Sequence, residues 1–289
     1  MLPGMAGKAR IAIVGAGNLG SALAVALRRA GYTIDAVVTH SRKSQVRAGA
    51  LGKQVGARVM TGLAESRADV VWLCVPDAEI ARAADSLAPQ IDWKKKVALH
   101  SSGALTSDAL SSLRARGAAV ASVHPLMTFV RGSRPSLAGV PFAIEGDAAA
   151  MRVARRMVRA LGGKAHTIRK NDKAAYHAWG TFASPLLTAL LVTTEQVAGE
   201  AGVRGKEARG RMAPILRQTL ENYVWFGAAD AFSGPIIRGD VETVKKHLRV
   251  LRERRTAREV YLALARAALE FLPAKNKTAL RRALRFSGQ

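Results

Sequence analysis

Short apolar runs alternate with helix-like segments through the first half of the chain. The runs are nearly continuous in apolar character, which is typical of strands buried on both faces of a parallel sheet. Strands that alternate with helices predict right-handed crossovers, and therefore an α/β fold with a doubly wound parallel sheet. The predicted strands are Ile11 to Val14, Ile34 to Thr39, Val70 to Val75, Val97 to Ser101, Ala119 to His124 and Phe142 to Glu145.

A helical pattern follows the last of these strands. In "AAAMRVARRMVRALGG", apolar residues recur at helical spacing, and Gly162 follows as a plausible C-terminal cap. The segment "KAHTIR" then predicts one last strand at an edge of the sheet.

The pattern changes near Lys170, after which helix-like segments are separated by Gly, Ser and Pro. We therefore predict two domains, residues 1–169 with the sheet and residues 170–289 entirely helical. The second domain should begin with an apolar helix of about thirty residues, capped by Asn171 or Asp172 and kinked at Pro185. Asp240 is a further expected N-cap, with an inward stripe formed by Val241, Val244, Leu248 and Leu251.

Three glycines lie between the first predicted strand and the following helix. Gly15 permits a tight turn, Gly17 lets backbone N–H groups reach a pyrophosphate, and Gly20 lets the helix pack close to the strand. The positive end of the helix dipole adds to the attraction for phosphates. This context predicts a Rossmann dinucleotide-binding domain, although glycines that serve packing alone remain the alternative. The expected contacts in this loop come from Gly15, Ala16, Gly17, Asn18, Leu19 and Gly20.

The end of the second predicted strand indicates which dinucleotide binds. An acidic residue there would hold a ribose 2′-hydroxyl, but the chain reads "VVTHSRKS". Ser41, Arg42 and Lys43 could instead bind a 2′-phosphate, so we predict NADP rather than NAD. The alternative is that Arg42 and Lys43 merely open a solvated helix. Val75 and Pro76, at the end of a neighbouring strand, are the expected wall of the nicotinamide site.

Composition and charge limit where in the cell the protein can lie and what it can bind. Apolar residues make up 49% of the chain, but no apolar run approaches the roughly 18 residues of a membrane span. With a single cysteine, Cys74, an internal disulfide is impossible, so we expect a cytoplasmic protein without membrane contact. The net charge of +24 could attract nucleic acid or steer an anionic ligand. The arginines are scattered along helices with few aromatics between them, so solvated helix faces are the favoured interpretation and no nucleic-acid partner is expected.

Several motifs together resemble a known family. They are "GAGNLG", "VPDAEI", "HSSGAL", "HPLMTF", "KAAYHAW" and "GPIIRGD". The chain resembles two-domain Rossmann-like oxidoreductases whose helical half is a domain of unknown function. These are similar to 6-phosphogluconate and β-hydroxyacid dehydrogenases, ketopantoate reductase, pyrroline-5-carboxylate reductase and deazaflavin-dependent NADP reductases. The resemblance implies NADP-dependent hydride transfer in a cleft between domains, and a homodimer formed through the helical domains.

Four residues are candidates for the chemistry beyond hydride transfer. Ser102 follows a strand, where its hydroxyl and nearby N–H groups could bind a carbonyl or an anion; a capped helix start is the alternative. His124 ends another strand and could bind substrate or nicotinamide, or be a turn histidine. Lys173 and His177 share one helical face, and either could donate a proton.

The resemblance supports Lys173, because a lysine near the start of this helix is catalytic in β-hydroxyacid dehydrogenases and ketopantoate reductase. Tyr176 or His177 stands where those enzymes carry an amide side chain. The alternatives are a solvated lysine for Lys173 and a structural histidine for His177.

The expected function is an NADP-dependent oxidoreductase acting on a small carbonyl, imine or hydroxy-acid substrate that could be anionic. Two alternatives stay open. One is an NADP-binding sensor or scaffold without turnover, and the other is a deazaflavin-coupled NADP reductase. The six histidines lack close partners at ligand spacing, so no metal site is predicted.

Overall fold

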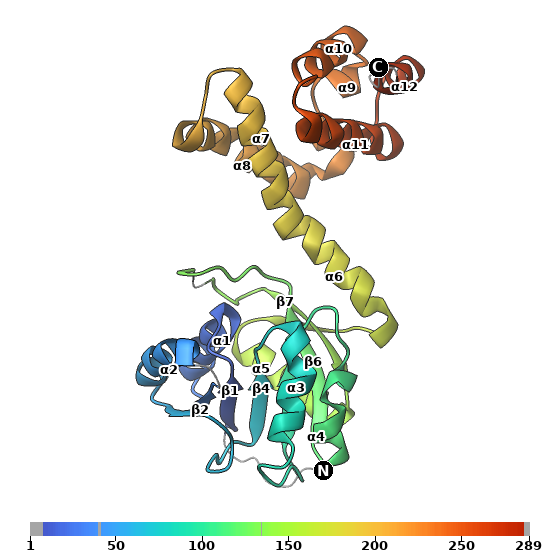
Figure 1. Cartoon of the computed structure of the whole chain (residues 1–289). Coiled ribbons are helices and arrows are strands. Elements are labelled where there is room, and N and C mark those ends of the chain that lie inside the picture. The colour runs from blue at the N-terminus through green and yellow to red at the C-terminus, as the bar shows by residue number, and fades with distance from the viewer. Residues whose placement is uncertain (1–7, 40–41, 134, 286–289) are drawn as a thin grey trace. The chain divides into compact units, whose positions relative to one another are not determined.

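The computed structural model describes residues 8–39, 42–133 and 135–285 (Figure 1). Backbone contacts divide the chain into two compact units, Met1–Phe182 and Ala183–Gln289. The first helix after the sheet, α6 (Lys173–Thr181), therefore belongs with the sheet. The domain boundary at residue 170, which the sequence pattern suggests, stays a prediction.

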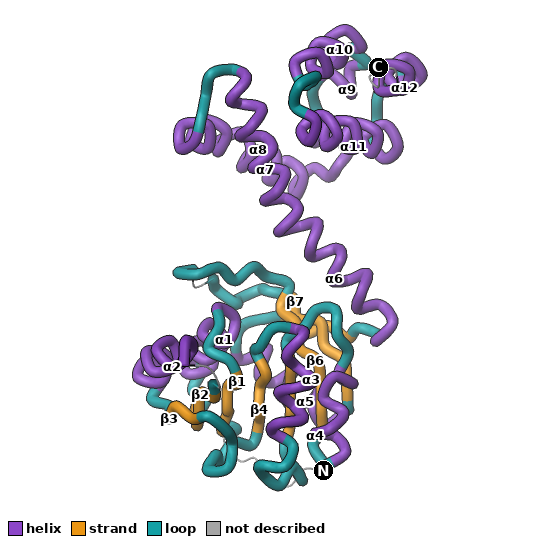
Figure 2. The backbone as a smooth tube through the Cα atoms, in the orientation of Figure 1, coloured by secondary structure: helices purple, strands orange, loops and turns teal. Residues whose placement is uncertain are grey.

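One eight-stranded sheet forms the centre of the first unit, in the order β3-β2-β1-β4-β5-β6-β7-β8 (Figure 2). All neighbouring pairs are parallel except β6 and β7, which are antiparallel. This confirms the α/β class and corrects the expected all-parallel sheet, because the described residues between β6 and β7 contain no crossover helix. The strands are β1 (Arg10–Val14), β2 (Thr33–Val38), β3 (Arg58–Met60), β4 (Val70–Leu73), β5 (Val97–His100), β6 (Ala119–Pro125), β7 (Pro141–Gly146) and β8 (Lys164–Thr167).

Helices cover both faces of the sheet. On one face, Leu23, Leu51 and Met157 bury the helices α1, α2 and α5 against Ile13 and Trp72. On the other, α3 and α4 pack into a second apolar cluster with the opposite side of the same strands. Burial on both faces explains the continuous apolar runs. The helices are α1 (Asn18–Arg29), α2 (Arg42–Val55), α3 (Asp77–Leu87), α4 (Ser111–Ala115) and α5 (Ala148–Ala160), with short 3₁₀ turns η1 (Ser107–Leu110) and η2 (Lys170–Asp172).

In the described residues of the second unit, all the regular elements are helices joined by short turns, as predicted. Pro185 lies in a π-helical turn, η3 (Phe182–Leu186), between α6 and the next helix, which agrees with the expected interruption there. Asp240 caps α10, since its carboxylate accepts the N–H of Thr243 at 3.0 Å, and Val244 and Leu248 are buried beneath it. The helices are α7 (Leu187–Glu200), α8 (Gly205–Ala231), α9 (Pro235–Arg238), α10 (Val241–Val250), α11 (Arg255–Phe271) and α12 (Lys277–Arg285).

Within the described residues, none of the helices combines the length and the apolar character needed to span a bilayer.

Candidate functional site

The glycine turn has the geometry that its sequence predicts. Gly15 has a φ of +101°, and a Cβ there would lie 2.7 Å from the carbonyl oxygen of Cys74. A Cβ on Gly20 would lie 2.0 Å from the carbonyl oxygen of Gly15, so helix α1 can begin this close to the strand only without a side chain. Gly17, by contrast, has no atom within 4 Å of its missing Cβ. The space above the start of α1 is therefore open to a ligand.

A cavity of about 730 Å³ lies beside this turn. It opens at the carboxyl ends of β1, β2 and β4, and the strand order reverses between β1 and β4. In open α/β sheets, ligands bind in the crevice at such a switch point. The lining includes the predicted Gly15, Ala16, Gly17, Val75 and Pro76. Leu19 instead packs against the core, and Asn18 donates through Nδ2 to the carbonyl oxygen of Phe129 at 3.2 Å.

The far wall of the cavity comes from the start of α2. Thr39 and Ser44 are hydrogen-bonded through their hydroxyls, and Arg47 follows on the next turn of the helix. Ser41 and the side chains of Arg42 and Lys43 lie outside the described residues. Their contacts with a 2′-phosphate thus stay a prediction.

A hydrogen bond connects the wall of the cavity to the predicted catalytic segment. Asp77, directly after Pro76, accepts the hydroxyl of Ser102 at 2.6 Å. That hydroxyl also accepts the N–H groups of Ala104 and Leu105, at 3.2 and 2.8 Å. The N–H of Ser102 donates to Nδ1 of His100 at 3.1 Å. Because its polar groups are occupied, Ser102 fixes the loop after β5, and its direct contact with a substrate stays a prediction.

Lys173 is buried under the same loop, with 1% of its surface exposed. Its Nζ donates to the hydroxyl of Ser122 at 2.7 Å and to the carbonyl oxygen of Ser102 at 3.1 Å. Ser122 lies on β6, and its hydroxyl donates to the same carbonyl oxygen at 3.1 Å. An ammonium group has three protons, so one of them is left for a further acceptor. The structure thus excludes a solvated Lys173.

Two buried polar atoms beside Lys173 have no hydrogen-bond partner. They are Nδ1 of His124, at the end of β6, and the hydroxyl of Tyr176 on α6. The two rings meet edge to face, with centroids 5.7 Å apart. Buried polar groups are nearly always paired, because each unpaired one costs about 1–3 kcal/mol. No described residue supplies a hydrogen-bond partner for either atom.

Gly103 allows the two histidines to approach each other. A Cβ at this position would lie 2.8 Å from Nε2 of His124 and 2.6 Å from Cδ2 of His177. The rings of His124 and His177 have centroids 6.1 Å apart. His177 is exposed, unlike Lys173 on the previous turn of the helix. The structure therefore brings the four candidate catalytic residues together, and His177 is the exposed member of the four.

Burial and a nearby positive charge keep the cluster in defined protonation states. Burial, together with the nearby charge of Lys173, lowers the pKa of His124 to about 4. Burial likewise lowers the pKa of His100 to about 4. Burial also lowers the pKa of Lys173, although the negative charges of Glu145 and Asp77 act to raise it. Burial raises the pKa of Tyr176. At neutral pH, His124 is a neutral imidazole and Tyr176 a protonated phenol, which can each donate a hydrogen bond.

Three further residues contribute to this site: Tyr176 and Asp77, which the sequence places next to the predicted site residues, and Ser122, which the sequence does not indicate. Tyr176 was detectable, because it lies three residues after Lys173 on the same helix. Ser122 carries no local signal, because its role depends on a lysine 51 residues away. Among the described residues, no cluster of three or more potential metal ligands occurs.

Two protein-family models match consecutive parts of the chain. A Rossmann-like domain matches residues 5–125, and a domain of unknown function, DUF2520, matches residues 140–268. The chain therefore combines a Rossmann-like domain with a DUF2520 domain, which confirms the resemblance seen in its motifs. No curated protein matches it.

Solved structures share the fold over nearly the whole chain. A candidate NADP oxidoreductase from Bacteroides fragilis is 20% identical, with a TM-score of 0.76 over 90% of this chain and 97% of the other. An imine reductase from a Pseudomonas species is 19% identical, with a TM-score of 0.64 over 96% and 100%. A reductive aminase from Aspergillus terreus, solved with NADPH and ethyl-5-oxohexanoate, is 15% identical, with a TM-score of 0.67 over 96% and 99%. At these identities the similarity establishes the fold.

Proposed function

We propose that this protein is an NADP-dependent oxidoreductase that acts on a small carbonyl, imine or hydroxy-acid substrate. The observation that carries the proposal is the cavity at the switch point, with an open Gly17 at the start of α1 and a wall formed by Val75 and Pro76. The residues present fit a dinucleotide, since the turn offers free N–H groups to a pyrophosphate. The NADPH-bound reductive aminase with the same fold supports this choice of cofactor.

When bound, NADPH supplies a hydride, so the chain itself must hold the acceptor and provide one proton. The unpaired atoms of His124 and Tyr176 are the groups proposed to bind the substrate's oxygen or nitrogen. Tyr176 is a phenol with a raised pKa, and it donates a proton more readily to a developing alkoxide or amide anion than to a neutral group. Lys173 holds the loop of Ser102 and adds positive charge beside that developing anion.

The test follows the loss of NADPH absorbance at 340 nm with panels of cyclic imines, ketones with and without amines, and keto acids. The key variant is Gly17→Asp, because Gly17 has open space and Asp is a favourable N-cap residue. Its carboxylate should repel the pyrophosphate without unfolding the protein, and should abolish NADPH binding and turnover. Gly210→Asp, at another glycine with open space on α8, is the matched control and should keep both.

The other two functions predict different results. An NADP-binding sensor or scaffold would bind NADPH and lose it in Gly17→Asp, but would show no turnover with any panel. A deazaflavin-coupled reductase would oxidise NADPH only when the deazaflavin is added as hydride acceptor. If neither NADPH nor NADH bound at millimolar concentration, the proposed function would be wrong.

We also propose that the protein forms a homodimer through its helical unit. Near the end of α8, consecutive large apolar side chains are exposed: Tyr223, Val224, Trp225 and Phe226, with Trp225 at 78%. Large apolar side chains that are all exposed on one turn of a helix favour burial against a partner. Light scattering should give twice the chain mass for the wild type, and the chain mass for Trp225→Glu combined with Phe226→Glu.

With its single cysteine, the protein is further proposed to be cytoplasmic.

A further inference from the structure

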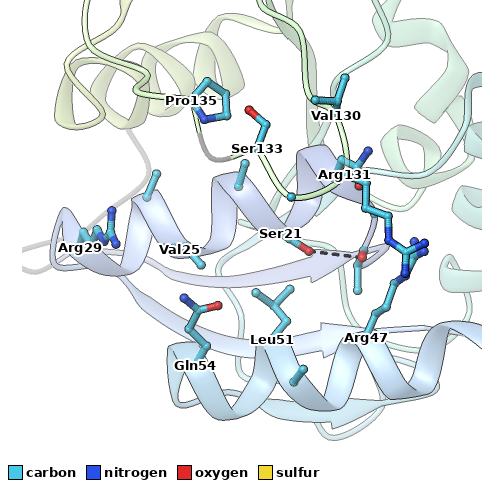
Figure 3. Close-up of a pocket in the computed structure, with 17 residues that line it drawn as sticks. Ser21, Val25, Arg29, Arg47, Leu51, Gln54, Val130, Arg131, Ser133 and Pro135 are labelled. Carbon is cyan, nitrogen blue, oxygen red and sulfur yellow. Dashed lines mark hydrogen bonds between the residues drawn. The ribbon is translucent and has the colours of Figure 1, made fainter. Parts of the chain in front are cut away.

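A second pocket, of about 310 Å³, lies along the side of α1 (Figure 3). It is bounded by α1, by α2 and, after β6, by residues 130–133 and Pro135. Asn18 holds the loop after β6 to the start of α1 through its bond to the carbonyl oxygen of Phe129. The pocket thus has walls from three separate parts of the first unit.

Three arginines from these three walls surround the pocket. Arg29 comes from α1, Arg47 from α2 and Arg131 from the loop. Figure 3 shows Arg47 and Arg131 at one end of the pocket and Arg29 at the other. None of the described lining residues is acidic, and these arginines take part in no ion pair with another described residue. All three are exposed to solvent, and the two guanidinium groups at one end can bind an anion between them.

An apolar strip forms the floor of the pocket between its charged ends, with the polar side chains of Ser21 and Gln54 beside it. Ala22, Val25 and Ala26 of α1 face Ala50 and Leu51 of α2. A simple inorganic anion would leave this floor exposed to water, whereas an apolar chain would cover it, at about 25 cal/mol per Å² buried. The lining therefore fits a molecule with an anionic head and a short apolar body.

We propose that this pocket binds a small organic anion, a phosphate monoester or a carboxylate with an apolar chain. The anionic group lies between Arg47 and Arg131, and the chain follows the floor toward Arg29. This site goes beyond the proposed function, because it is separate from the cofactor cavity. The two sites adjoin, since Ala16, Gly17 and Arg47 line both. An occupant would therefore sense whether the cofactor cavity is filled.

The test uses isothermal titration with hexyl phosphate and hexanoate, each in the absence and presence of saturating NADPH. We expect at least one of them to bind in both conditions, and inorganic phosphate to bind much more weakly. Arg131→Gln should weaken binding about tenfold or more, because it removes a charge-assisted hydrogen bond. Val25→Asp should abolish binding by placing a negative charge on the floor. Arg152→Gln, an exposed arginine on α5, is the control and should change nothing.

Several results would overturn the proposal. One is that neither organic probe binds the wild type. Another is that NADPH displaces the probe completely, which would make the pocket part of the cofactor site. The third is that Arg131→Gln binds the probe as tightly as the wild type does. Circular dichroism of each variant shows whether it is folded. The titrations without NADPH need no cofactor, so they remain decisive even if the proposed function fails.

Discussion

Nζ of Lys173 donates to the hydroxyl of Ser122 at 2.7 Å, which joins the start of α6 to the middle of β6. The two residues are 51 positions apart in the chain. This bond, with the one to the carbonyl oxygen of Ser102, keeps a buried positive charge beneath His124. Lys173 therefore influences the candidate site through its charge as well as through the hydrogen bonds that it makes.

Lys173→Met keeps the volume of the side chain and removes its charge. The pKa of His124 should then rise from about 4, because the lysine is one cause of its depression, but stay below 6.5 because burial persists. An NMR titration of the imidazole signals measures this. Lys170→Met, at an exposed lysine that pairs with Asp108, is the control and should leave that pKa unchanged. An unchanged His124 pKa in Lys173→Met would contradict the account.

Acid should destabilise the protein through His124 and His100. Both pKa values are lowered from 6.5 to about 4 in the folded state. Between these two pH values the unfolded chain binds more protons, so the free energy of unfolding falls as the pH falls from 6.5 to 4. The loss is of the order of 3 kcal/mol for each histidine. Urea unfolding at pH 7.5 and pH 4.5 measures it.

Two variants test whether His124 contributes to this acid-induced loss of stability. His124→Asn removes one of the two buried imidazoles, so the loss of stability between the two pH values should be smaller than in the wild type. His166→Asn, at an exposed histidine on β8, should show the wild-type loss. Equal losses in all three proteins would show that His124 is not held neutral by burial.

Tyr176→Phe should separate function from stability. The hydroxyl has no partner, so removing it should leave the free energy of unfolding unchanged or raise it by about 1 kcal/mol. Turnover should fall at least tenfold if this hydroxyl supplies the proton. Tyr261→Phe makes the opposite comparison, because Tyr261 is hydrogen-bonded to His247 at 3.1 Å. It should cost about 1 kcal/mol and leave turnover intact. Full turnover by Tyr176→Phe would remove the proton-donor role.

Gly103→Ala should displace the histidines. The new Cβ would lie within 3 Å of both His124 and His177, and His124 is too enclosed to move freely. We expect kcat to fall while the Kd for NADPH stays the same, because Gly103 does not line the cofactor cavity. Gly210→Ala is the control. In the double variant Gly103→Ala with His177→Ala, one of the two clashes is gone, and the free energy of unfolding should partly recover relative to Gly103→Ala alone.

Much of the fold follows from local sequence patterns. The apolar runs predicted six of the strands, and "KAHTIR" predicted β8, because burial on both faces leaves a strong local signal. The strand β3 was missed, since its Arg58 and Val59 are exposed at the sheet edge. The antiparallel direction of β7 was also missed. Direction depends on the path of residues 126–140, which have no periodic pattern.

The candidate site was only partly predictable for a similar reason. The glycine turn is local, and its three glycines have the predicted spacing and geometry. Sequence spacing put Lys173 and His177 on one helical face, but it could not show that one is buried and the other exposed. The contacts with Ser122 and Ser102 join residues 51 and 71 positions apart, and no local pattern encodes them.

A crystal structure of the protein with NADPH tests the central claim most directly. The account predicts density for the pyrophosphate over the N–H groups of Ala16 and Gly17, with the adenosine beside Thr39 and Arg47 and the nicotinamide beside Val75 and Pro76. Density for NADPH elsewhere on the protein, or an empty turn at saturating NADPH, would contradict it.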